Sequence, residues 1–463
     1  MKFEDFWEIY LNENLVEHYD SVKEVFSKEL ESYVEEEYDL GEVLTEFIGL
    51  YDNAKEFEKI IEFTKILKNK NNKIFKEVFP YFDDFLIDYY CHHNKEEGLA
   101  ETARDYMEFP LKDYDLLLKS LRKLIYYGYS VLGEKIIEKA YGEVKKSSGL
   151  IQGAEYDLAL FKNQIELEKG FERYEKDKRY DWILYKENLG RFDFETSDDY
   201  IELLEEGFTK SEEQLGEQFL LEFKDKKREK GVELLEKGFM KSMRGKNMSF
   251  PISGSIWNNM YNYWERKKGQ NTSEKYFDLT EKEFKAFVRS KSGFILDYRF
   301  ESVLILWGSS YVYDYLRSAE LIEVDQYERI KNIIKKLKEA LIKENRENLW
   351  RYDFVHRWSK SQMVSEEEQR AEIEIFEKSY NYKAEVGRIR EGFFIESRAS
   401  TEKRLLDFEK QIEERSPTPI KREFPKIGRN EKITVKYKDG TVKKQVKYKR
   451  VKEDIEKGNC EII

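Results

Sequence analysis

The sequence is poor in cysteine and histidine. Its 463 residues include two cysteines, Cys91 and Cys460, and four histidines. Two cysteines are too few for a disulfide framework or a cysteine-rich zinc site. The adjacent side chains of Cys91-His92-His93 cannot easily converge on one ion. We therefore expect no metal and no cofactor, and we interpret Cys91-His92-His93 as a helix end whose histidines lie in a surface turn.

Proline and long apolar runs are scarce as well. Of the six prolines, Pro417, Pro419 and Pro425 lie close together near the C-terminus, so the body of the chain suits uninterrupted helices. The longest apolar run, 303–307, is too short to cross a bilayer, and the N-terminus lacks the apolar region of a signal peptide. We expect a soluble, cytoplasmic protein with no membrane partner.

Charged residues make up 38% and aromatic residues 15% of the chain, a combination that fits long helices with one charged and one buried face. The formal net charge is −12. From Ser416 onward there are 14 Lys and Arg against 7 Asp and Glu, so this segment is net +7 and the rest is −19. An acidic body disfavours nucleic-acid binding by the whole molecule. Nucleic acid is possible only through the basic C-terminal segment, which could equally dock onto the acidic body.

Helical periodicity fills the chain as far as about residue 415. Residues 116–140 have two apolar stripes separated by Gly128, which predicts a helical hairpin. Thr280 or Asp278 is expected to cap one later helix, and Asp325 another. The predicted fold is mainly α, an α-solenoid of helical hairpins with a small C-terminal ββα(β) module. The expected parts are a helical repeat region (1–245), a second helical region (246–415), a proline-rich linker (416–425) and a basic β-hairpin module (426–463).

A short internal repeat supports the solenoid prediction. Gly207-Phe208 ends a segment, Ile-Glu-Leu-Leu-Glu-Glu-Gly-Phe, that recurs as Val-Glu-Leu-Leu-Glu-Lys-Gly-Phe at Gly238-Phe239 and more weakly at Gly170-Phe171. Each copy is interpreted as a helix end with a glycine cap. The spacing resembles that of tetratricopeptide-like or HEAT-like helical repeats, although most tetratricopeptide consensus positions are not met. The alternative is that short helices rich in Glu, Leu and Lys resemble one another by composition.

Near the C-terminus the period changes from helical to two. Alternating residues flank Asp439-Gly440, which predicts a β-hairpin with a two-residue loop. One or two helical turns at 451–457 and a last strand at 460–463 would complete the module. Its predicted contact residues are basic: Arg429, Lys436, Lys438, Lys447 and Lys449.

The entry to this module, Pro425-Lys-Ile-Gly428-Arg429-Asn430, resembles the start of the SEC-C motif, the segment that ends the SecA translocase and many stand-alone proteins. In that family Gly-Arg-Asn leads into a cysteine-rich zinc knuckle. Here no cysteine stands at the ligand positions. The resemblance implies a metal-free accessory module that contacts a partner protein or a ribosomal or nucleic-acid surface. The alternative is an ordinary basic hairpin.

One aromatic stretch of the body is a candidate binding site. Asparagine side chains in a helical groove can hold the backbone of an extended peptide, and Trp and Tyr supply contact area. The alternative is an aromatic stripe that faces the core. The candidate residues are Trp257, Asn258, Asn259, Tyr261, Asn262 and Trp264.

Arg351 and His356 match the short R-x4-H pattern of HEPN-type ribonucleases. In such enzymes the histidine does acid–base work on the ribose and the arginine stabilises phosphate charge. Trp350 and Trp358 nearby could stack on bases. The alternative is a helix with an aromatic core face and these two residues at its edge.

No phosphate-binding glycine loop, nucleophile elbow or H-E-x-x-H motif is present. The sequence therefore favours a non-enzymatic scaffold that binds a protein or peptide and carries a basic accessory module. The alternative function is nucleic-acid processing by Arg351 and His356. An enzyme whose site the sequence does not reveal is a third possibility, and the oligomeric state is open.

Overall fold

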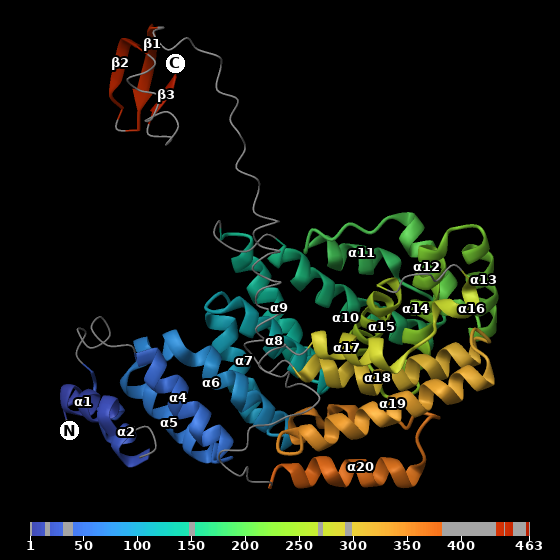
Figure 1. Cartoon of the computed structure of the whole chain (residues 1–463), viewed down its shortest axis with the longest axis horizontal. Helices are drawn as coiled ribbons and strands as arrows, with labels where there is room; N and C mark the ends of the chain where they lie inside the picture. The colour runs from blue at the N-terminus through green and yellow to red at the C-terminus, as the bar shows by residue number, and fades with distance from the viewer. Residues whose placement is uncertain are drawn as a thin grey trace. The chain divides into compact units, whose positions relative to one another are not determined.

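The computed structural model describes residues 2–13, 19–30, 40–147, 153–266, 272–291, 299–381, 432–438, 440–447 and 460–462. The chain divides into two compact units, Met1–Phe394 and Ile395–Ile463. The described residues of the first unit are mainly helical (Figure 1), as the sequence predicts. The part boundaries expected from composition stay predictions.

The first group of helices runs from the N-terminus to the middle of the chain: α1 (Phe3–Glu13), α2 (Tyr19–Phe26), α4 (Leu40–Asn53), α5 (Phe57–Lys70), α6 (Asn72–His92), α7 (Glu96–Glu108), α8 (Tyr114–Tyr126), α9 (Ser130–Val144), α10 (Ala154–Asp177) and α11 (Trp182–Gly190). The second group completes this unit: α12 (Asp198–Thr209), α13 (Glu212–Lys224), α14 (Arg228–Arg244), α15 (Phe250–Glu265), α16 (Ser273–Tyr276), α17 (Glu281–Ser290), α18 (Arg299–Ser318), α19 (Val324–Glu344), the 3₁₀-helix η2 (Leu349–His356) and α20 (Glu366–Ser379).

Local sequence accounts for several helix boundaries. Gly128 has a φ of +91° in the turn between α8 and α9, which confirms the predicted helical hairpin. Thr280 is the N-cap of α17, but its hydroxyl donates to the Glu283 carboxylate rather than accepting from the backbone. The cap predicted for α19 is wrong, because Glu323 occupies the N-cap and Asp325 lies in the first turn. An acidic side chain in the first turn still stabilises the helix, because its negative charge interacts favourably with the helix dipole.

Helices that are close in sequence pack together along most of the unit. Contacts join α5 to α6, α6 to α7 and α8, α9 to α10, α13 to α14, and α14 to α15. This local packing is typical of solenoids, in which each repeat contacts its neighbours. The end of the unit departs from it, because η2 packs on α6, far upstream in the chain, as well as on α18 and α20. The C-terminal helices therefore close back onto the N-terminal third.

The glycines of the internal repeat are not helix caps, which corrects the prediction. Gly170, Gly207 and Gly238 lie inside α10, α12 and α14. A Cβ atom added at Gly207 would collide with the Cβ of Lys237. One added at Gly238 would collide with the Leu215 side chain and the Tyr315 hydroxyl. Two of the three glycines thus allow neighbouring helices to approach closely, whereas Gly170 has open space around it.

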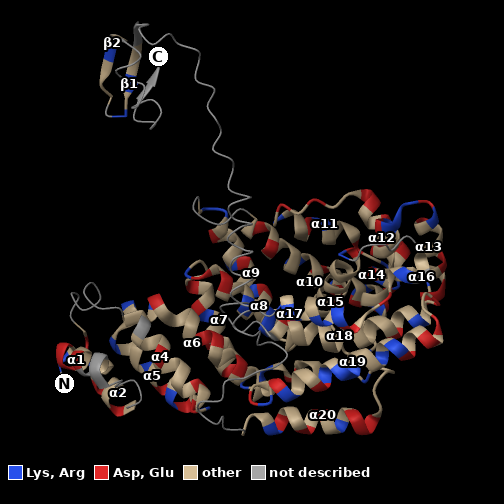
Figure 2. Cartoon of the chain, in the orientation of Figure 1, with Lys and Arg blue, Asp and Glu red and all other residues tan. Residues whose placement is uncertain are grey.

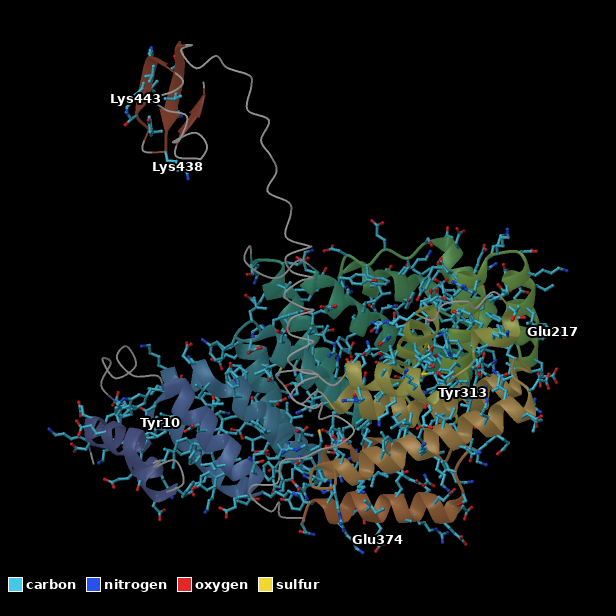
Figure 3. All side chains as sticks on the ribbon, viewed as in Figure 1. Tyr10, Glu217, Tyr313, Glu374, Lys438 and Lys443 are labelled. Atoms are coloured by element: carbon cyan, nitrogen blue, oxygen red, sulfur yellow. The ribbon has the colours of Figure 1, made fainter. Side chains whose placement is uncertain are left out.

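The phenylalanines that follow these glycines are buried. The rings of Phe171 and Phe208 lie 5.4 Å apart between centroids and both contact Phe250, so they share one small core. Phe239 packs instead on Trp257 in the large core that runs through the rest of the unit. Figure 3 shows Tyr313 inside this unit, where it is fully buried, and Glu374 at its edge. Figure 2 shows acidic and basic residues interleaved along the helices.

The second unit contains a three-stranded antiparallel sheet in the order β2-β1-β3, from β1 (Lys432–Tyr437), β2 (Val442–Lys447) and β3 (Cys460–Ile462). β1 and β2 fall where the alternation predicts strands, and β3 lies within the last strand expected at 460–463. The Tyr437 N–H donates to the Thr441 carbonyl at 2.8 Å and Gly440 has a φ of +86°, so the turn is one residue longer than the two-residue loop expected. The helical turns predicted at 451–457 and the linker at 416–425 lie outside the described residues.

In the part of the chain that the structure describes, no helix combines the length and apolar content that a bilayer crossing needs.

Candidate functional site

Helix α15 has two faces with different roles. Trp257 and Trp264 lie one above the other on its inner face, 1% and 0% exposed, with ring centroids 5.5 Å apart. Both tryptophans therefore belong to the core and have no face left for a ligand, which corrects the binding role predicted for them. Tyr261 is half-buried and also packs against the core. The alternative interpretation of this stretch, an aromatic core stripe, describes these three residues.

The outer face of α15 lines a groove. Pro251, Ser255, Asn258 and Asn262 follow one another at spacings of four, three and four residues, which places them on one stripe of the helix. With Asn259 they line a cavity of about 180 Å³ whose other walls come from α8, α10 and α18. We call this cavity the asparagine groove. The structure thus separates the predicted asparagines, which face the groove, from the predicted tryptophans, which do not.

Charged side chains border the asparagine groove. Arg122 of α8 forms an ion pair with Glu301 of α18, with Nη1 3.4 Å from Oε1. Asp157 of α10 lies on the same rim, and burial raises the pKa of its carboxyl although Arg122 acts against this shift. Both signs of charge are present, so the rim favours neither a strongly anionic nor a strongly cationic ligand.

The amides of the groove have unequal freedom to bind a ligand. Asn259 is 9% exposed and donates from Nδ2 to the Ser255 carbonyl at 3.0 Å, within its own helix. Asn258 and Asn262 are exposed, and Gln164 from α10 adds a fourth amide to the lining. A primary amide offers two donors and an acceptor, which match the C=O and N–H groups of a peptide backbone. Asn258, Asn262 and Gln164 are therefore the groups best placed for such contacts.

Arg351 lies in η2 and is held by two buried carboxylates. Its Nη2 is 2.5 Å from Asp52 Oδ1, and its Nη1 is 2.8 Å from Asp88 Oδ2. Asp88 also pairs with Lys123 at 2.8 Å. Burial acts to lower the pKa of Arg351, but Asp52 and Asp88 raise it overall. Its guanidinium is therefore engaged in joining η2 to α4 and α6.

His356 lies at the end of the same 3₁₀-helix and has a different partner. Its Nε2 lies 2.8 Å from Glu372 Oε1 of α20, and the side chain is 9% exposed. Arg351 and His356 are thus each paired with other residues rather than brought together at an open cleft. Trp350 is fully buried and Trp358 is 3% exposed, so neither presents a stacking surface.

The segment Cys91-His92-His93 ends α6, as predicted, with His93 as the C-cap and a positive φ of 52° at Asn94. The prediction that both histidines lie at the surface is wrong for His92. Its Nδ1 lies 2.7 Å from Asp353 Oδ2, and its side chain is 12% exposed. Among the described residues, no three His, Cys, Asp or Glu side chains are grouped as metal ligands would be.

The basic residues predicted to make contacts in the second unit are only partly described. Lys436 and Lys438 are exposed on the sheet and its turn, and Figure 3 labels Lys438 at one end of the sheet. Lys447 belongs to β2, but only its backbone is described. Arg429 and Lys449 lie outside the described residues.

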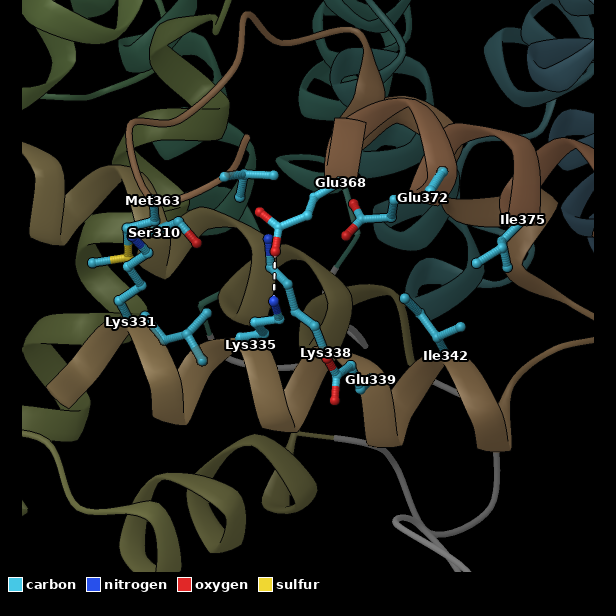
Figure 4. Close-up of a pocket in the computed structure, with 13 residues that line it drawn as sticks. Ser310, Lys331, Lys335, Lys338, Glu339, Ile342, Met363, Glu368, Glu372 and Ile375 are labelled. Carbon is cyan, nitrogen blue, oxygen red and sulfur yellow. Dashed lines mark hydrogen bonds and ion pairs between the residues drawn. The ribbon is translucent and has the colours of Figure 1, made fainter. Parts of the chain in front are cut away.

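A second cavity, between α19 and α20, was not expected from the sequence. It has a volume of about 280 Å³, and both apolar and charged side chains line it, Lys338 among the charged ones (Figure 4). Lys338 is the residue from which the cavity could have been predicted, because it lies on the buried stripe of α19 with Ile334 and Leu341. A lysine on an apolar helix face is unusual unless it is paired.

Comparison with known proteins gives one short similarity. Over 48 residues the chain is 52% identical to the protein translocase subunit SecA of Amoebophilus asiaticus (strain 5a2); this stretch is 10% of the present chain and 4% of that SecA. The similarity is compatible with a segment like the C-terminus of SecA. No family model matches the chain, so none supports a tetratricopeptide-like repeat, and no solved structure matches it.

Proposed function

We propose that this protein is a helical scaffold that binds a protein or peptide, and that the asparagine groove holds an extended stretch of the ligand's backbone. The observation that carries the proposal is the stripe of exposed amides, Asn258 and Asn262 of α15 with Gln164 opposite, facing one groove. Amide side chains bind backbone amides whatever the ligand's sequence. Specificity would then come from the groove's rim, where Arg122 and Glu301 supply both signs of charge.

The proposed architecture behind this function is an α-solenoid of helical hairpins, tetratricopeptide-like or HEAT-like in the manner of its packing. The contacts between sequence-neighbouring helices and the closely packed repeat glycines support it. Solenoids of this kind present extended binding surfaces because each helical pair is rotated slightly against the next.

A displayed library of random peptides tests the groove. We expect the wild-type chain to enrich peptides whose affinity falls roughly 10- to 100-fold in the Asn258→Ala/Asn262→Ala double variant, since two hydrogen bonds are removed. Asn53→Ala is the matched control, because Asn53 is an exposed asparagine at the end of α4, outside the groove. Peptides that bind the double variant as well as the wild type would refute the proposal.

We also propose that the basic C-terminal segment makes a second contact, as a metal-free relative of the SEC-C motif. The 48-residue similarity to SecA and the exposed Lys436 and Lys438 support this. The test compares partners retained by the full-length chain with those retained by a chain that ends at Ser416. Loss of one specific partner on shortening is expected. If both chains retain the same partners, the segment is not a recognition element.

The nuclease alternative has no comparable support. Arg351 is occupied by Asp52 and Asp88, and His356 faces Glu372. An acid–base pair for RNA cleavage needs both groups within reach of one ribose phosphate.

A further inference from the structure

The cavity between α19 and α20 combines apolar side chains with charged ones, and among its lysines Lys338 is the buried one. Six of its lining side chains are aliphatic or thioether: Ile334, Ile342, Met363, Val364, Ala371 and Ile375. In Figure 4 Ile342 and Ile375 face each other across one end of the cavity, and Met363 lies at the other. Lys338 reaches from α19 toward α20 between these ends. Such walls favour a hydrocarbon body of modest size.

Among the described residues, the ammonium group of Lys338 has no hydrogen-bond acceptor. The residue is 8% exposed, and within the described chain no hydrogen bond or ion pair engages its Nζ. Its Nζ lies 5.0 Å from the centroid of the Trp307 ring, a cation–π contact. A buried lysine is normally paired, because an isolated buried charge is costly. The unpaired ammonium beside a cavity is therefore a site for an anionic group.

The carboxylates around Lys338 are already satisfied by other donors. Glu368 accepts from Lys335 and from the Ser365 backbone N–H. Glu372 accepts from the Trp307 indole and lies at hydrogen-bond distance from His356. Burial acts to raise the pKa of Glu372, but the nearby charges of Lys338 and His356 and the bonds from His356 and Trp307 lower it overall. Lys338 therefore acts on Glu372 as a neighbouring charge, while the hydrogen bonds to both acids come from other donors.

Another acid whose charge acts on Lys338 is Asp314 of α18, which accepts from Tyr327, Ser361 and the Gln362 backbone. Burial lowers the pKa of Lys338, while Glu372, Asp314 and Glu368 act in the opposite direction. A single ammonium group matches a monoanion better than a phosphate, which is usually bound by several cationic or N–H groups.

We propose that the cavity between α19 and α20 binds an aliphatic monocarboxylate, whose carboxylate pairs with Lys338 and whose hydrocarbon chain lies against Ile334, Ile342 and Ile375. This site is separate from the asparagine groove and does not depend on it. Binding removes methylene groups from water, so affinity should rise about fourfold with each added CH₂ until the cavity is full.

Calorimetric titration of the full-length chain near neutral pH tests the proposal with three probes of one length: octanoate, 1-octanol and octylamine. We expect octanoate to bind at least ~10-fold more tightly than octanol, and octylamine to bind most weakly, since only octanoate supplies the missing anion. Equal binding of octanoate and octanol, or no binding of octanoate, would overturn the proposal.

Two variants locate the carboxylate. Lys338→Met keeps most of the side chain's length and volume and removes its charge, and should reduce octanoate binding to the level of octanol. Lys336→Met is the control on the same helix, because Lys336 is exposed and pairs with Glu281 outside the cavity; its octanoate affinity should stay within about twofold of wild type. Octanoate affinity that survives Lys338→Met refutes the assignment.

A third variant covers the case in which Lys338→Met does not fold. Ala371 is exposed on α20 and lines the cavity, so Ala371→Trp fills the space without disturbing the core. We expect a loss of octanoate affinity of ~10-fold or more; unchanged affinity places the ligand elsewhere. A short peptide with a free C-terminal isoleucine also presents a carboxylate beside an aliphatic group. If this peptide binds more tightly than octanoate, the ligand is the C-terminus of a protein and the proposal of a free aliphatic acid is refuted.

Discussion

Two buried cations in the first unit have opposite surroundings. Arg351 lies in η2, its side chain is 12% exposed, and it is paired with two carboxylates from α4 and α6. Lys338, under α20, is 8% exposed and has no ion-pair partner within the described chain. A fully paired buried charge holds elements together, whereas an unpaired one costs stability unless a ligand pairs with it. The first region is therefore a structural junction and the second a candidate ligand site.

The largest predicted effect is at the structural junction. Arg351→Met leaves Asp52 and Asp88 buried without their shared partner. We expect the free energy of unfolding to fall by about 3–5 kcal/mol, the usual cost of breaking a buried pair from one side. Urea denaturation monitored by circular dichroism measures it.

Arg370→Met serves as the control for this loss, because Arg370 is 79% exposed in its pair with Glu366. Its effect should be below about 0.5 kcal/mol. A small effect of Arg351→Met would show that the two regions do not differ as described.

At the cavity the same kind of substitution should act in the other direction. Lys338→Met removes a buried, unpaired ammonium and keeps the side-chain volume, so we expect the free energy of unfolding to rise by about 1–3 kcal/mol at neutral pH. Burial depresses the pKa of Lys338, so the wild type regains stability as the pH rises through this lowered pKa toward 10.5. The advantage of the variant should therefore shrink at high pH in the same urea titrations, and marked destabilisation would mean that Lys338 has a partner.

The pH dependence of ligand binding sharpens the contrast further. Octanoate pairs with the charged form of Lys338, and octanoate itself is ionised throughout the alkaline range. Because burial lowers the pKa of Lys338 below 10.5, affinity should decline as the pH rises, and should begin to do so earlier than for an exposed lysine. Above that pKa the loss is about tenfold per pH unit. Calorimetry at several pH values checks this, and a flat profile argues against Lys338 as the anchor.

The smallest predicted effect concerns two buried serines near the cavity. Within the described part of the chain the Ser310 hydroxyl has no hydrogen-bond partner, whereas the Ser361 hydroxyl donates to Asp314 at 2.7 Å. Ser310→Ala should change the free energy of unfolding by less than about 0.5 kcal/mol, and Ser361→Ala should reduce it by about 1–2 kcal/mol. Thermal unfolding of the two variants side by side measures the difference; equal losses would mean that Ser310 is also satisfied.

Local features were the most predictable from sequence. The α8–α9 hairpin follows from two apolar stripes and Gly128, and strands β1 and β2 follow from alternation around Asp439-Gly440. The candidate site was predictable in part, because the asparagines of α15 were identified while the tryptophans beside them were misassigned. On one helix, residues three or four apart share a face, but the pattern alone does not say which face meets the rest of the protein.

The sequence alone determined that the body is mainly helical and that a basic β-hairpin segment stands near the C-terminus, since both depend on the periodicity of neighbouring residues. Tertiary structure decided the rest. Gly207 and Gly238 became close-contact positions because other helices pack against them. Arg351 is a structural anchor because distant helices α4 and α6 supply two carboxylates to it. Within the described chain, no helix supplies an ion-pair partner to Lys338. Burial and pairing are properties of the assembled chain, so no local pattern could distinguish these two cations.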